Sequence, residues 1–259
     1  MGNDTILEVQ GIVKHFAGLV ALNRVSFGIR QGDLMGLIGP NGAGKSVLIN
    51  VITGLYPPSE GTVFYKQENI TGLRPDLIVK KNISRTFQQS TLFLDLPVID
   101  NISMGVRTAA EVGLWEGIFK TRSHRQKDKG VREQCEKTMQ LLNLDRHAHE
   151  YARNLPYGLQ KVVAIGIALA ANPELLILDE PLTGLITAEA EEVMTRIYSL
   201  HRQGLTVMII EHNMRAVMGH CNRIVVLSFG TKIAEGTPQE IRQNRGVIQS
   251  YLGESGPPC

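Results

Sequence analysis

The sequence predicts an α/β fold in which a mainly parallel core sheet is interrupted by a helical insertion. Short apolar segments alternate with helical patterns on both sides of residues 90–160, and this alternation is typical of parallel strands joined by helices. A glycine-rich turn at residues 39–46 leads from one apolar segment into a helical pattern. Residues 90–160 instead hold long helical patterns. We therefore expect one domain over residues 1–259, with a helical subdomain at about 90–160 inserted in the α/β core.

The N-terminal part holds short strands and one buried helix. Ile6–Val9 and Ala21–Ile29 have the composition of strands. Leu34–Ile38 is a short apolar run that suits a buried parallel strand and is too short for a helix. Lys45–Thr53 is rich in Val, Ile and Leu, which predicts a mostly buried helix closed by Gly54. The glycines expected to separate the strands are Gly11, Gly18 and Gly32.

The C-terminal part returns to the alternation of helices and strands. A turn at Asn172-Pro173 separates the first helix from the strand that follows it, and a hairpin at Gly230 follows the last predicted strand. The predicted elements, in order, are a helix over Gln160–Ala171, a strand over Leu175–Leu178, a helix near Ala188–Arg202, a strand over Thr206–Ile210, a further helix, and a strand over Ile224–Leu227.

The composition narrows the class of protein. The chain has 259 residues, of which 43% are hydrophobic and 20% charged, values that exclude intrinsic disorder. With 27 Lys+Arg against 25 Asp+Glu, the net charge is +2, whereas a dedicated polyanion binder usually has a clear basic excess. Three distant cysteines without a CxxC pair argue against a disulfide framework or a zinc site and suit a reducing cytoplasm.

Two further patterns bear on membranes and polyanions. The longest apolar run, Val162–Ala171, has ten residues, whereas a membrane-spanning helix needs roughly 18–20. The N-terminal residues show no secretory signal pattern. Residues 120–137 carry seven Lys/Arg against three acidic residues, and we expect a solvated helix face there in preference to a functional basic patch.

The glycine-rich turn has the pattern of a phosphate-binding loop. Its glycines allow successive backbone N–H groups to point at phosphate oxygens, and the helix that follows contributes the positive end of its dipole. Lys45 supplies a cation for the β- and γ-phosphates, and Ser46 supplies a hydroxyl ligand for Mg²⁺. The match to GxxxxGK[ST] consists of Gly39, Pro40, Asn41, Gly42, Ala43, Gly44, Lys45 and Ser46. The sequence therefore predicts a site for a nucleoside triphosphate.

The sequence gives no support for guanine specificity. Guanine-nucleotide switches combine a DxxG segment downstream of the loop with an NKxD segment. The DxxG present here is Asp33–Gly36, which lies upstream of the loop and inside a predicted strand, and the sequence contains no NKxD. We therefore expect ATP as the nucleotide.

Charged and polar residues follow two of the predicted strands. Asp179 and Glu180 come directly after Leu175–Leu178, and His212 follows Thr206–Ile210 closely. Ligands of open α/β sheets bind at the carboxyl ends of the strands. We expect Asp179 to hold Mg²⁺, directly or through water, and Glu180 to activate an attacking water as general base. His212 is placed to hydrogen-bond the γ-phosphate.

Two other segments are candidate contributors to the site. Gln88, in Arg85-Thr86-Phe87-Gln88, is placed to reach the metal and the attacking water. Gly158, in Leu155–Gln160, precedes an uncharged helix whose N-terminus suits an anion. Because only one helix and one strand separate Gly158 from Asp179, the anion expected at Gly158 is not the phosphate bound at Lys45 of the same chain.

These segments together resemble a known family. The ordered set GPNGAGKS, RTFQQ, LPYGLQ, LLILDEP and IIEHNM is similar to the nucleotide-binding subunit of ABC transporters, across nearly the whole chain. Further segments resemble the LivG-type subunit of branched-chain amino acid importers, namely AGLVALNRVSF, INVITGLYPPSEG, SRTFQQSTLF, LWEGIFKTRSHRQ, ARNLPYGLQK and EGTPQEIRQNRGVIQSYLGE. The resemblance implies a P-loop NTPase fold of the ABC type, with an N-terminal antiparallel β subdomain.

The resemblance also implies roles for individual residues. It aligns Phe16 with the aromatic that stacks on adenine, and Gln88 with a lid glutamine that reaches the metal. Glu180 aligns with the catalytic base and His212 with the switch histidine. The segment Leu155–Gln160, with Tyr157 and Gly158, aligns with the family's signature segment.

The implied partners follow from how such subunits assemble. In that family two subunits dimerise head to tail, so that the phosphate loop of each faces the signature segment of the other, and the pair docks on two membrane permeases. The resemblance therefore implies a second ATPase subunit, either LivF-like or identical to this chain, two transmembrane permease subunits and, indirectly, a periplasmic solute-binding protein. It implies no nucleic-acid partner, and it places the chain in the cytoplasm, peripherally on the inner face of the membrane.

The chain departs from the family pattern at several positions. Pro156 replaces the signature serine, and Val47 replaces a Thr or Ser after the loop lysine, leaving a backbone N–H for the α-phosphate. Ile186 replaces an Asn or Asp that helps to couple the two sites of the dimer. Lys161-Val162 and Ile167 stand where arginines are usual. Each change removes a polar contact, and a hydrogen bond to a charged group contributes about 1.5–3 kcal/mol. From Pro156 and Ile186 we expect the composite site that combines this chain's signature segment with a partner's phosphate loop to be the weaker of the two.

Three functions remain open at this point. The first is ATP binding and hydrolysis that energises an importer for branched-chain amino acids or related small solutes. The second is a degenerate ATP-binding subunit that relies on a catalytically stronger partner. The third is a soluble ABC ATPase that acts outside transport, on nucleic acid or ribosomes, although such proteins usually carry two cassettes or a basic insertion. The retained loop, Mg²⁺ and base residues favour the first.

Overall fold

A computed structural model describes residues 4–86, 92–109, 122–212 and 214–252, which form two sheets and nine α-helices within these ranges. The first sheet is antiparallel, with the strand order β2-β1-β4-β5. Its strands are β1 (Thr5–Phe16), β2 (Leu19–Arg30), β4 (Glu60–Tyr65) and β5 (Glu68–Asn69). The N-terminal antiparallel sheet that the resemblance implied is therefore confirmed.

The second sheet has the strand order β10-β9-β3-β8-β7-β6 and is parallel except for its edge strand β10. The expected α/β fold with a mainly parallel core is thus confirmed. The strands are β3 (Leu34–Ile38), β6 (Ile83–Arg85), β7 (Leu175–Asp179), β8 (Thr206–Ile210), β9 (Arg223–Ser228) and β10 (Thr231–Gly236).

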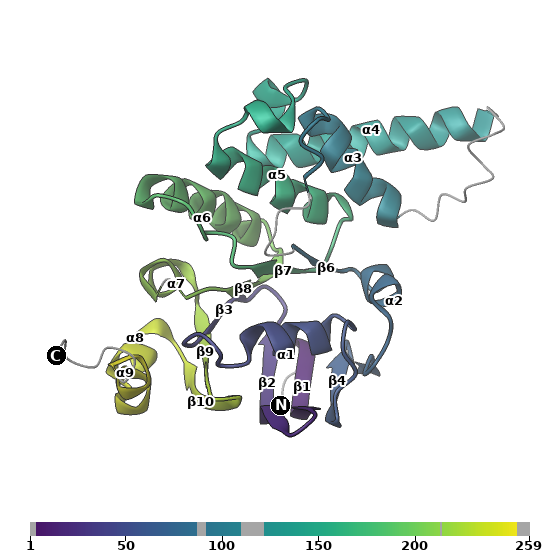
Figure 1. Ribbon diagram of the computed structural model, residues 1–259. Helices are drawn as coiled ribbons and strands as arrows, with labels where there is room; N and C mark the ends of the chain where they lie inside the picture. Colours follow the sequence, from purple (N-terminus) through teal and green to yellow (C-terminus); the bar gives the residue numbers. More distant parts are fainter. Residues whose placement is uncertain (1–3, 87–91, 110–121, 213, 253–259) are drawn as a thin grey trace.

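Helices cover both faces of the parallel sheet (Figure 1). On one face lies α1 (Lys45–Ile52), together with the antiparallel sheet. On the other face lie α5, α6 and α7, with α3 and α4 packed on the outer side of α5. The remaining bounds are α2 (Pro75–Lys80), α3 (Val98–Ala109), α4 (Arg122–Leu142), α5 (Tyr157–Ala170), α6 (Thr187–Arg202), α7 (Met214–His220), α8 (Pro238–Gln243) and α9 (Arg245–Leu252).

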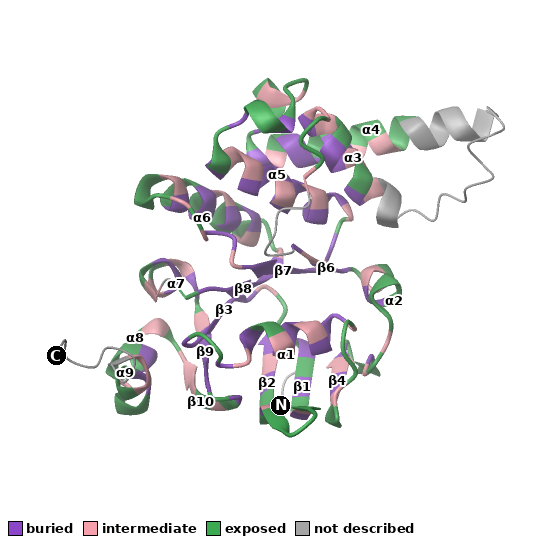
Figure 2. Ribbon diagram, in the orientation of Figure 1, coloured by how far each residue is buried: buried purple, intermediate pink, exposed green. Residues whose placement is uncertain are grey.

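The core sits in two layers, one on each face of the parallel sheet. Along β3, Leu34 and Ile38 pack into the cluster that lies against the helices, whereas Met35 and Leu37 pack into the cluster that lies against α1 and the antiparallel sheet. Successive side chains of a strand point to opposite faces. Because both faces are covered, the whole strand is buried (Figure 2), which explains its continuous apolar sequence.

The structure changes some predicted boundaries. β1 does not stop at Gly11 but continues to Phe16, and the register with β2 shifts between Val9 and Ile12. Gly11 has a φ of +58°, so the glycine marks a bulge and not the end of a strand. The helix predicted from Gln160 begins earlier, at Tyr157, with Pro156 at its N-cap.

The helices of residues 92–109 and 122–170 pack closely on one another. A Cβ at Gly105 of α3 would collide with the carbonyl oxygen of Ile167 in α5, so the two helix backbones touch at this glycine. On α4, Lys129, Arg132 and Lys137 are exposed, in line with the solvated face expected for that part of the basic stretch. Among the residues described, no helix combines the length and the apolar character that crossing a bilayer requires.

Candidate functional site

The phosphate-loop residues form the turn between β3 and α1. Gly42 and Gly44 have φ values of +76° and +96°, a region that residues with a Cβ rarely adopt. A Cβ at Gly44 would lie 2.8 Å from the Ala21 carbonyl oxygen, and one at Gly39 would collide with the Leu227 carbonyl. The glycines are therefore required both by the curl of the loop and by the strands packed against it.

Lys45, the first residue of α1, is almost fully buried at 5% exposure. Its Nζ donates to the carbonyl oxygens of Gly39 at 2.6 Å and Pro40 at 3.0 Å. The ammonium is thus held over the loop, and the first turn of α1 carries no acidic side chain. Both features leave positive potential at the helix N-terminus, where an anion is favoured.

A cavity of about 410 Å³ opens at this loop. The structure brings to it Phe16 from the end of β1, the loop, and Glu180 from beyond β7, three regions that lie far apart in the sequence. The described residues that line it are Phe16, Leu19, Val20, Ala21, Asn41, Gly42, Ala43, Gly44, Lys45, Ser46, Val47, Glu180, Phe229 and Gly230. A flat apolar end and a cationic end with backbone N–H groups suit a nucleotide.

Phe16 lies at the apolar end, with 39% of its surface exposed. Its ring meets the Tyr56 ring edge-on at a centroid distance of 5.4 Å, and the Lys14 ammonium lies 5.0 Å from its centroid. Lys14 is itself fixed because its Nζ donates to the Pro57 carbonyl at 2.8 Å. These contacts orient the phenyl ring and leave part of it open to a stacking partner.

Asp179, at the end of β7, is buried and forms an ion pair. Its Oδ2 lies 2.7 Å from Nη2 of Arg85, whose side chain is 9% exposed. A second guanidinium nitrogen, Nη1, donates to Asn50 at 2.6 Å and to Thr53 at 3.1 Å, both at the end of α1. Arg85 therefore connects β6, β7 and the phosphate-loop helix around Asp179.

Glu180 follows Asp179 in a left-handed backbone conformation, with a φ of +47°. Its N–H donates to the Ile210 carbonyl of β8 at 3.0 Å, and its Oε2 accepts from the Thr183 hydroxyl at 3.1 Å. A residue other than glycine at positive φ is uncommon and is often found at functional sites. The turn directs the carboxylate into the cavity.

His212 lies beside this carboxylate, with 53% of its side chain exposed. Its Nδ1 is 4.0 Å from Glu180 Oε2 and 3.9 Å from Glu211 Oε2. Glu211 is buried, and its Oε1 accepts from the Leu182 N–H at 2.8 Å. The ends of β7 and β8 thus hold Glu180 and His212 next to each other, as their positions in the sequence predicted.

The signature segment lies apart from this cavity. Within the described part of the chain, Tyr157 and Gly158 are not among the residues that line the cavity. They pack instead near the start of α6: a Cβ at Gly184 would lie 2.9 Å from the Tyr157 ring, and one at Gly158 would lie 3.3 Å from Glu189 Cβ. Tyr157 is exposed, as is Ile186 at the N-cap of α6.

Gln88 falls outside the described residues, so its predicted role stays a prediction. For Mg²⁺, the described residues supply oxygen ligands of the right type, the Ser46 hydroxyl in the cavity wall and the carboxylate of Asp179. Among the described residues, no three His, Cys, Asp or Glu side chains cluster as a metal cage. Mg²⁺ is usually held by one or two protein oxygens together with substrate phosphates, so this sparse set fits the ion.

Sequence reasoning did not assign a role to several residues at the site. The Arg85 pairing joins residues 94 positions apart, a contact that no local pattern specifies. Thr183 stands three residues after Glu180 and donates to its carboxylate. This spacing does not by itself predict a hydrogen bond between the two side chains. Phe229 lines the cavity from the β9–β10 turn, and the Phe-Gly pair in a predicted hairpin was the available signal.

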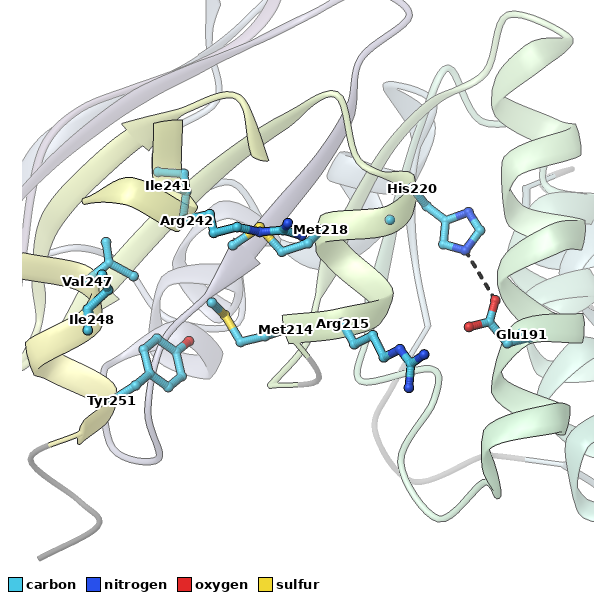
Figure 3. A pocket seen from close by; sticks show the side chains of 11 residues that line it. Glu191, Met214, Arg215, Met218, His220, Ile241, Arg242, Val247, Ile248 and Tyr251 are labelled. Atoms are coloured by element: carbon cyan, nitrogen blue, oxygen red, sulfur yellow. Dashed lines mark ion pairs between the residues drawn. The ribbon is translucent and has the colours of Figure 1, made fainter. Parts of the chain in front are cut away.

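A larger cavity of about 760 Å³ lies among α6, α7, α8 and α9 (Figure 3). Among the described residues, its lining includes none of the predicted site residues. Met214, Met218, Val247, Ile248 and Tyr251 give it a largely apolar wall, and the His220 and Glu191 side chains pair at 3.5 Å. Because it lacks the loop and the strand-end carboxylates, we place the candidate site in the smaller cavity.

Two protein families match the sequence of this chain. The family described as "ABC transporter" matches residues 22–183, more than half of the chain, and the family described as "Branched-chain amino acid ATP-binding cassette transporter" matches residues 231–256. The chain belongs to the ABC transporter ATP-binding family. The first match spans the phosphate loop, Asp179 and Glu180.

Individual relatives of this ABC family member cover nearly all of it. The high-affinity branched-chain amino acid transport ATP-binding protein LivG of Salmonella typhimurium is 38% identical over 251 residues, which are 96% of this chain and 98% of the relative. The structure of MJ1267, an ATP-binding cassette of an ABC transporter, in its ADP conformation superposes with a TM-score of 0.85 at 32% identity, over 96% of this chain and 99% of that one.

A dimeric cassette is also similar to this ABC family member. The structure of MJ0796 in a post-hydrolysis state bound to ADP and Pi superposes with a TM-score of 0.73 at 25% identity, over 90% of this chain and 98% of that one. Cassettes of this family are thus known with bound nucleotide and as dimers.

Proposed function

We propose that this chain is the ATP-binding and ATP-hydrolysing subunit that energises an ABC importer, for branched-chain amino acids or related small solutes. One observation carries the proposal. Phe16, the phosphate loop and the Glu180 carboxylate line a single cavity, although they come from three regions of the chain. The similarity to LivG over nearly the whole chain supports the class of solute.

In the proposed site, the nucleotide lies with its base against Phe16 and its phosphates in the turn of the loop. Backbone N–H groups of residues 41–47 and the Lys45 ammonium bind the phosphate oxygens. Pro40 and Gly39 contribute through their carbonyls, which hold Lys45 in place. The Ser46 hydroxyl and Asp179, with Gln88, would hold Mg²⁺, which offsets the negative charge that develops on the transferred phosphoryl group.

Glu180 is the proposed general base. Its carboxylate reaches the cavity, and the Thr183 hydroxyl orients it through a hydrogen bond. Such a base accepts a proton from the attacking water and accelerates a reaction by about 10²–10⁴-fold. His212 lies next to Glu180, with 4.0 Å between His212 Nδ1 and Glu180 Oε2. From this position a ring N–H of His212 would donate to the γ-phosphate while Glu180 binds the attacking water.

The proposed assembly is a dimer in which each nucleotide is completed by the other subunit. The exposed Tyr157 and the helix N-terminus at Gly158 lie apart from this chain's own cavity, so they suit a nucleotide bound to a partner. That partner is a LivF-like ATPase subunit or a second copy of this chain. Two transmembrane permeases, and indirectly a periplasmic solute-binding protein, complete the proposed importer, with this single-domain chain on the inner face of the membrane.

We further propose that the site formed with this chain's signature segment is the weaker of the two. Pro156 has no N–H to donate and no hydroxyl, and Ile186 is 69% exposed with an apolar side chain at the N-cap of α6. Vanadate trapping resolved for each site should label the other site preferentially. Equal labelling of the two sites would contradict this proposal.

The function is tested in the assembled transporter. Purified subunits reconstituted with their permeases into liposomes should couple Mg²⁺-dependent ATP hydrolysis to leucine uptake. Lys45→Ala should lose nucleotide binding and with it both activities, whereas Lys129→Ala, at an exposed position on α4, should retain both. Uptake that persists with Lys45→Ala in every copy would rule out this chain as the energising subunit.

A further inference from the structure

The turn between β9 and β10 consists of two residues, Phe229 and Gly230. Ser228 and Thr231 on either side are paired across the hairpin. Both turn residues have positive φ values, +45° for Phe229 and +73° for Gly230. Two-residue turns of this kind favour Asn or Asp followed by Gly, because these residues tolerate the left-handed region. A bulky aromatic at the first position is a conformational outlier.

The turn is fastened to the phosphate loop and to β2. Gly230 N–H donates to the Ala43 carbonyl at 3.0 Å, and the Gly230 carbonyl accepts from Asn23 N–H at 2.8 Å. A Cβ at Gly230 would lie 2.6 Å from the Ala21 carbonyl oxygen. Because the backbone of the turn is fixed on two sides, the position of the Phe229 side chain is set by the hairpin and not by packing in the core.

Phe229 is 91% exposed and nevertheless lines the nucleotide cavity. Large apolar side chains gain by burial about 1.5–3 kcal/mol, so a phenylalanine that is both strained and exposed has no explanation in the fold of the single chain. Three other exposed apolar side chains line the same cavity: Phe16, Leu19 and Val20. The neighbouring Gly230 bonds to both the phosphate loop, at Ala43, and β2, at Asn23, so Phe229 is held next to these two walls of the cavity.

We propose that Phe229 is a further nucleotide-contacting residue, whose ring covers the base–ribose part of bound ATP. The inference rests on the proposed function and adds a second aromatic wall to the one at Phe16. Aromatic rings bind bases through their faces, and this contact does not depend on hydrogen-bond donors. The burial that the ring lacks in the chain alone is then supplied by the ligand.

The decisive variant is Phe229→Asn, because Asn is a favoured residue at this turn position. We expect the melting temperature of the chain without nucleotide to be unchanged or higher, since strain is relieved. We expect ATP affinity, measured by isothermal titration calorimetry, to fall about tenfold, within the range for loss of one aromatic–base contact. Affinity for inorganic tripolyphosphate should not change, because that ligand has no base or ribose.

Two further variants serve as controls. Phe229→Tyr keeps an aromatic ring at the turn and should restore most of the ATP affinity lost in Phe229→Asn. Phe93→Asn changes another exposed phenylalanine, 54% exposed, which is not among the residues lining the cavity; its ATP affinity should equal that of the unmodified chain.

The outcomes separate the inference from the proposed function. If Phe229→Asn binds ATP with unchanged affinity while Lys45→Ala loses binding, the inference is wrong and the proposed nucleotide site stands. If Phe229→Asn keeps ATP affinity but lowers ATPase activity only in the assembled transporter, Phe229 is a subunit contact, which also overturns the inference. If Lys45→Ala binds ATP like the unmodified chain, the proposed function itself fails.

Discussion

At the scale of single residues, Arg85 connects three elements around the site: β6, β7 and the end of α1. Its guanidinium pairs with Asp179 and donates to Asn50 and Thr53, with both charged side chains almost fully buried. Removing one partner of a buried ion pair leaves the other charge uncompensated. The pair therefore fixes the carboxylate that is proposed to hold Mg²⁺ relative to the helix that follows the phosphate loop.

We predict that Arg85→Met lowers the free energy of unfolding by about 3–5 kcal/mol, the usual cost of breaking a buried pair. Urea denaturation of the chain without nucleotide measures this value. In the double variant Arg85→Met/Asp179→Asn the cost should be much smaller than the sum of the two single costs, because no buried charge is left unpaired. Additive effects of the two substitutions would show that the pair does not act as a unit.

The phosphate-loop positions could be predicted from the sequence because a contiguous pattern of eight residues specifies the turn, the helix start and the cation together. The positions of Glu180 and His212 could be predicted because each closely follows a predicted parallel strand, and the carboxyl ends of parallel strands share one edge of the sheet. Arg85 and Phe229 could not be assigned in this way. Arg85 pairs with Asp179, 94 residues away, and Gly230, the neighbour of Phe229, bonds to Ala43 in the N-terminal part of the chain. Tertiary contacts at such separations leave no periodic pattern in the sequence.

At the scale of elements, the N-terminus of α6 is incompletely capped. Ile186 occupies the N-cap, where its side chain has no atom to accept a hydrogen bond. The other half of a capping box is present, since Glu189 Oε2 accepts from the Ile186 N–H at 3.2 Å. A polar cap is thus missing at the position where the resemblance expects Asn or Asp.

We predict that Ile186→Asp raises the free energy of unfolding by about 0.5–2 kcal/mol, the usual contribution of an N-cap. Urea denaturation measures the change, and Ile186→Ala, which removes apolar surface without adding a cap, is the matched control. Ile186 is 69% exposed, so little packing is lost in either variant. Equal stability of Ile186→Asp and Ile186→Ala would contradict the missing-cap explanation.

Element boundaries could be predicted best where the sequence changes character abruptly. Leu34–Ile38 and Thr206–Ile210 are strands with the predicted limits. Asp33 and Gly39 flank the first buried run, and Gly204 and Glu211 stand close to the ends of the second. The strand end expected near Gly11 is wrong, because a glycine occurs both at strand ends and at bulges within a strand, and Gly11 marks a bulge. The start of α5 at Tyr157 was placed too late because the proline at its N-cap begins a helix whose first turn carries few apolar residues.

At the scale of the whole molecule, Glu174 ties the antiparallel sheet to the parallel one. Its carboxylate lies 2.5 Å from Lys66 Nζ, in the β4–β5 turn, and accepts from Asn82 at 3.1 Å, just before β6. The hydrogen bond from Lys66, followed by that from Asn82, lowers the pKa of Glu174 below its ordinary value of 4.5. The contact is partly exposed, so its effect is modest.

The lowered pKa of Glu174 predicts how the stability of the fold changes with pH. A carboxylate whose pKa is lower in the folded state stabilises the fold above its unfolded pKa, and this stabilisation is lost as the pH falls through the folded pKa. Urea midpoints measured from pH 6 downward, within roughly 2 units of the ordinary Glu pKa, should therefore fall less steeply for Glu174→Gln than for the unmodified chain. If the urea midpoints of the two proteins fall equally steeply with pH, the Glu174 contacts contribute nothing to stability.

The three-dimensional arrangement of the whole site could not be predicted from the sequence. The motifs predicted that a loop, a carboxylate pair and a histidine would meet at one sheet edge. The structure brings Glu180 to the loop cavity and His212 within 4.0 Å of Glu180, whereas Asp179 pairs with Arg85 and, like His212, is not among the described residues that line the cavity. The cavity wall formed by β2 and the β9–β10 turn depends on how the antiparallel sheet packs against the parallel one, which is set by the two hydrophobic layers as a whole. Gly44 and Gly230 allow that close approach.

We propose that ATP is hydrolysed at this cavity with Glu180 as the general base. The most direct measurement is the steady-state ATPase rate of the assembled transporter carrying Glu180→Gln, together with ATP affinity. We expect the rate to fall at least about 10²-fold while ATP affinity is retained, because the amide keeps the shape of the side chain but cannot accept the proton. An ATPase rate equal to that of the unmodified transporter would contradict it.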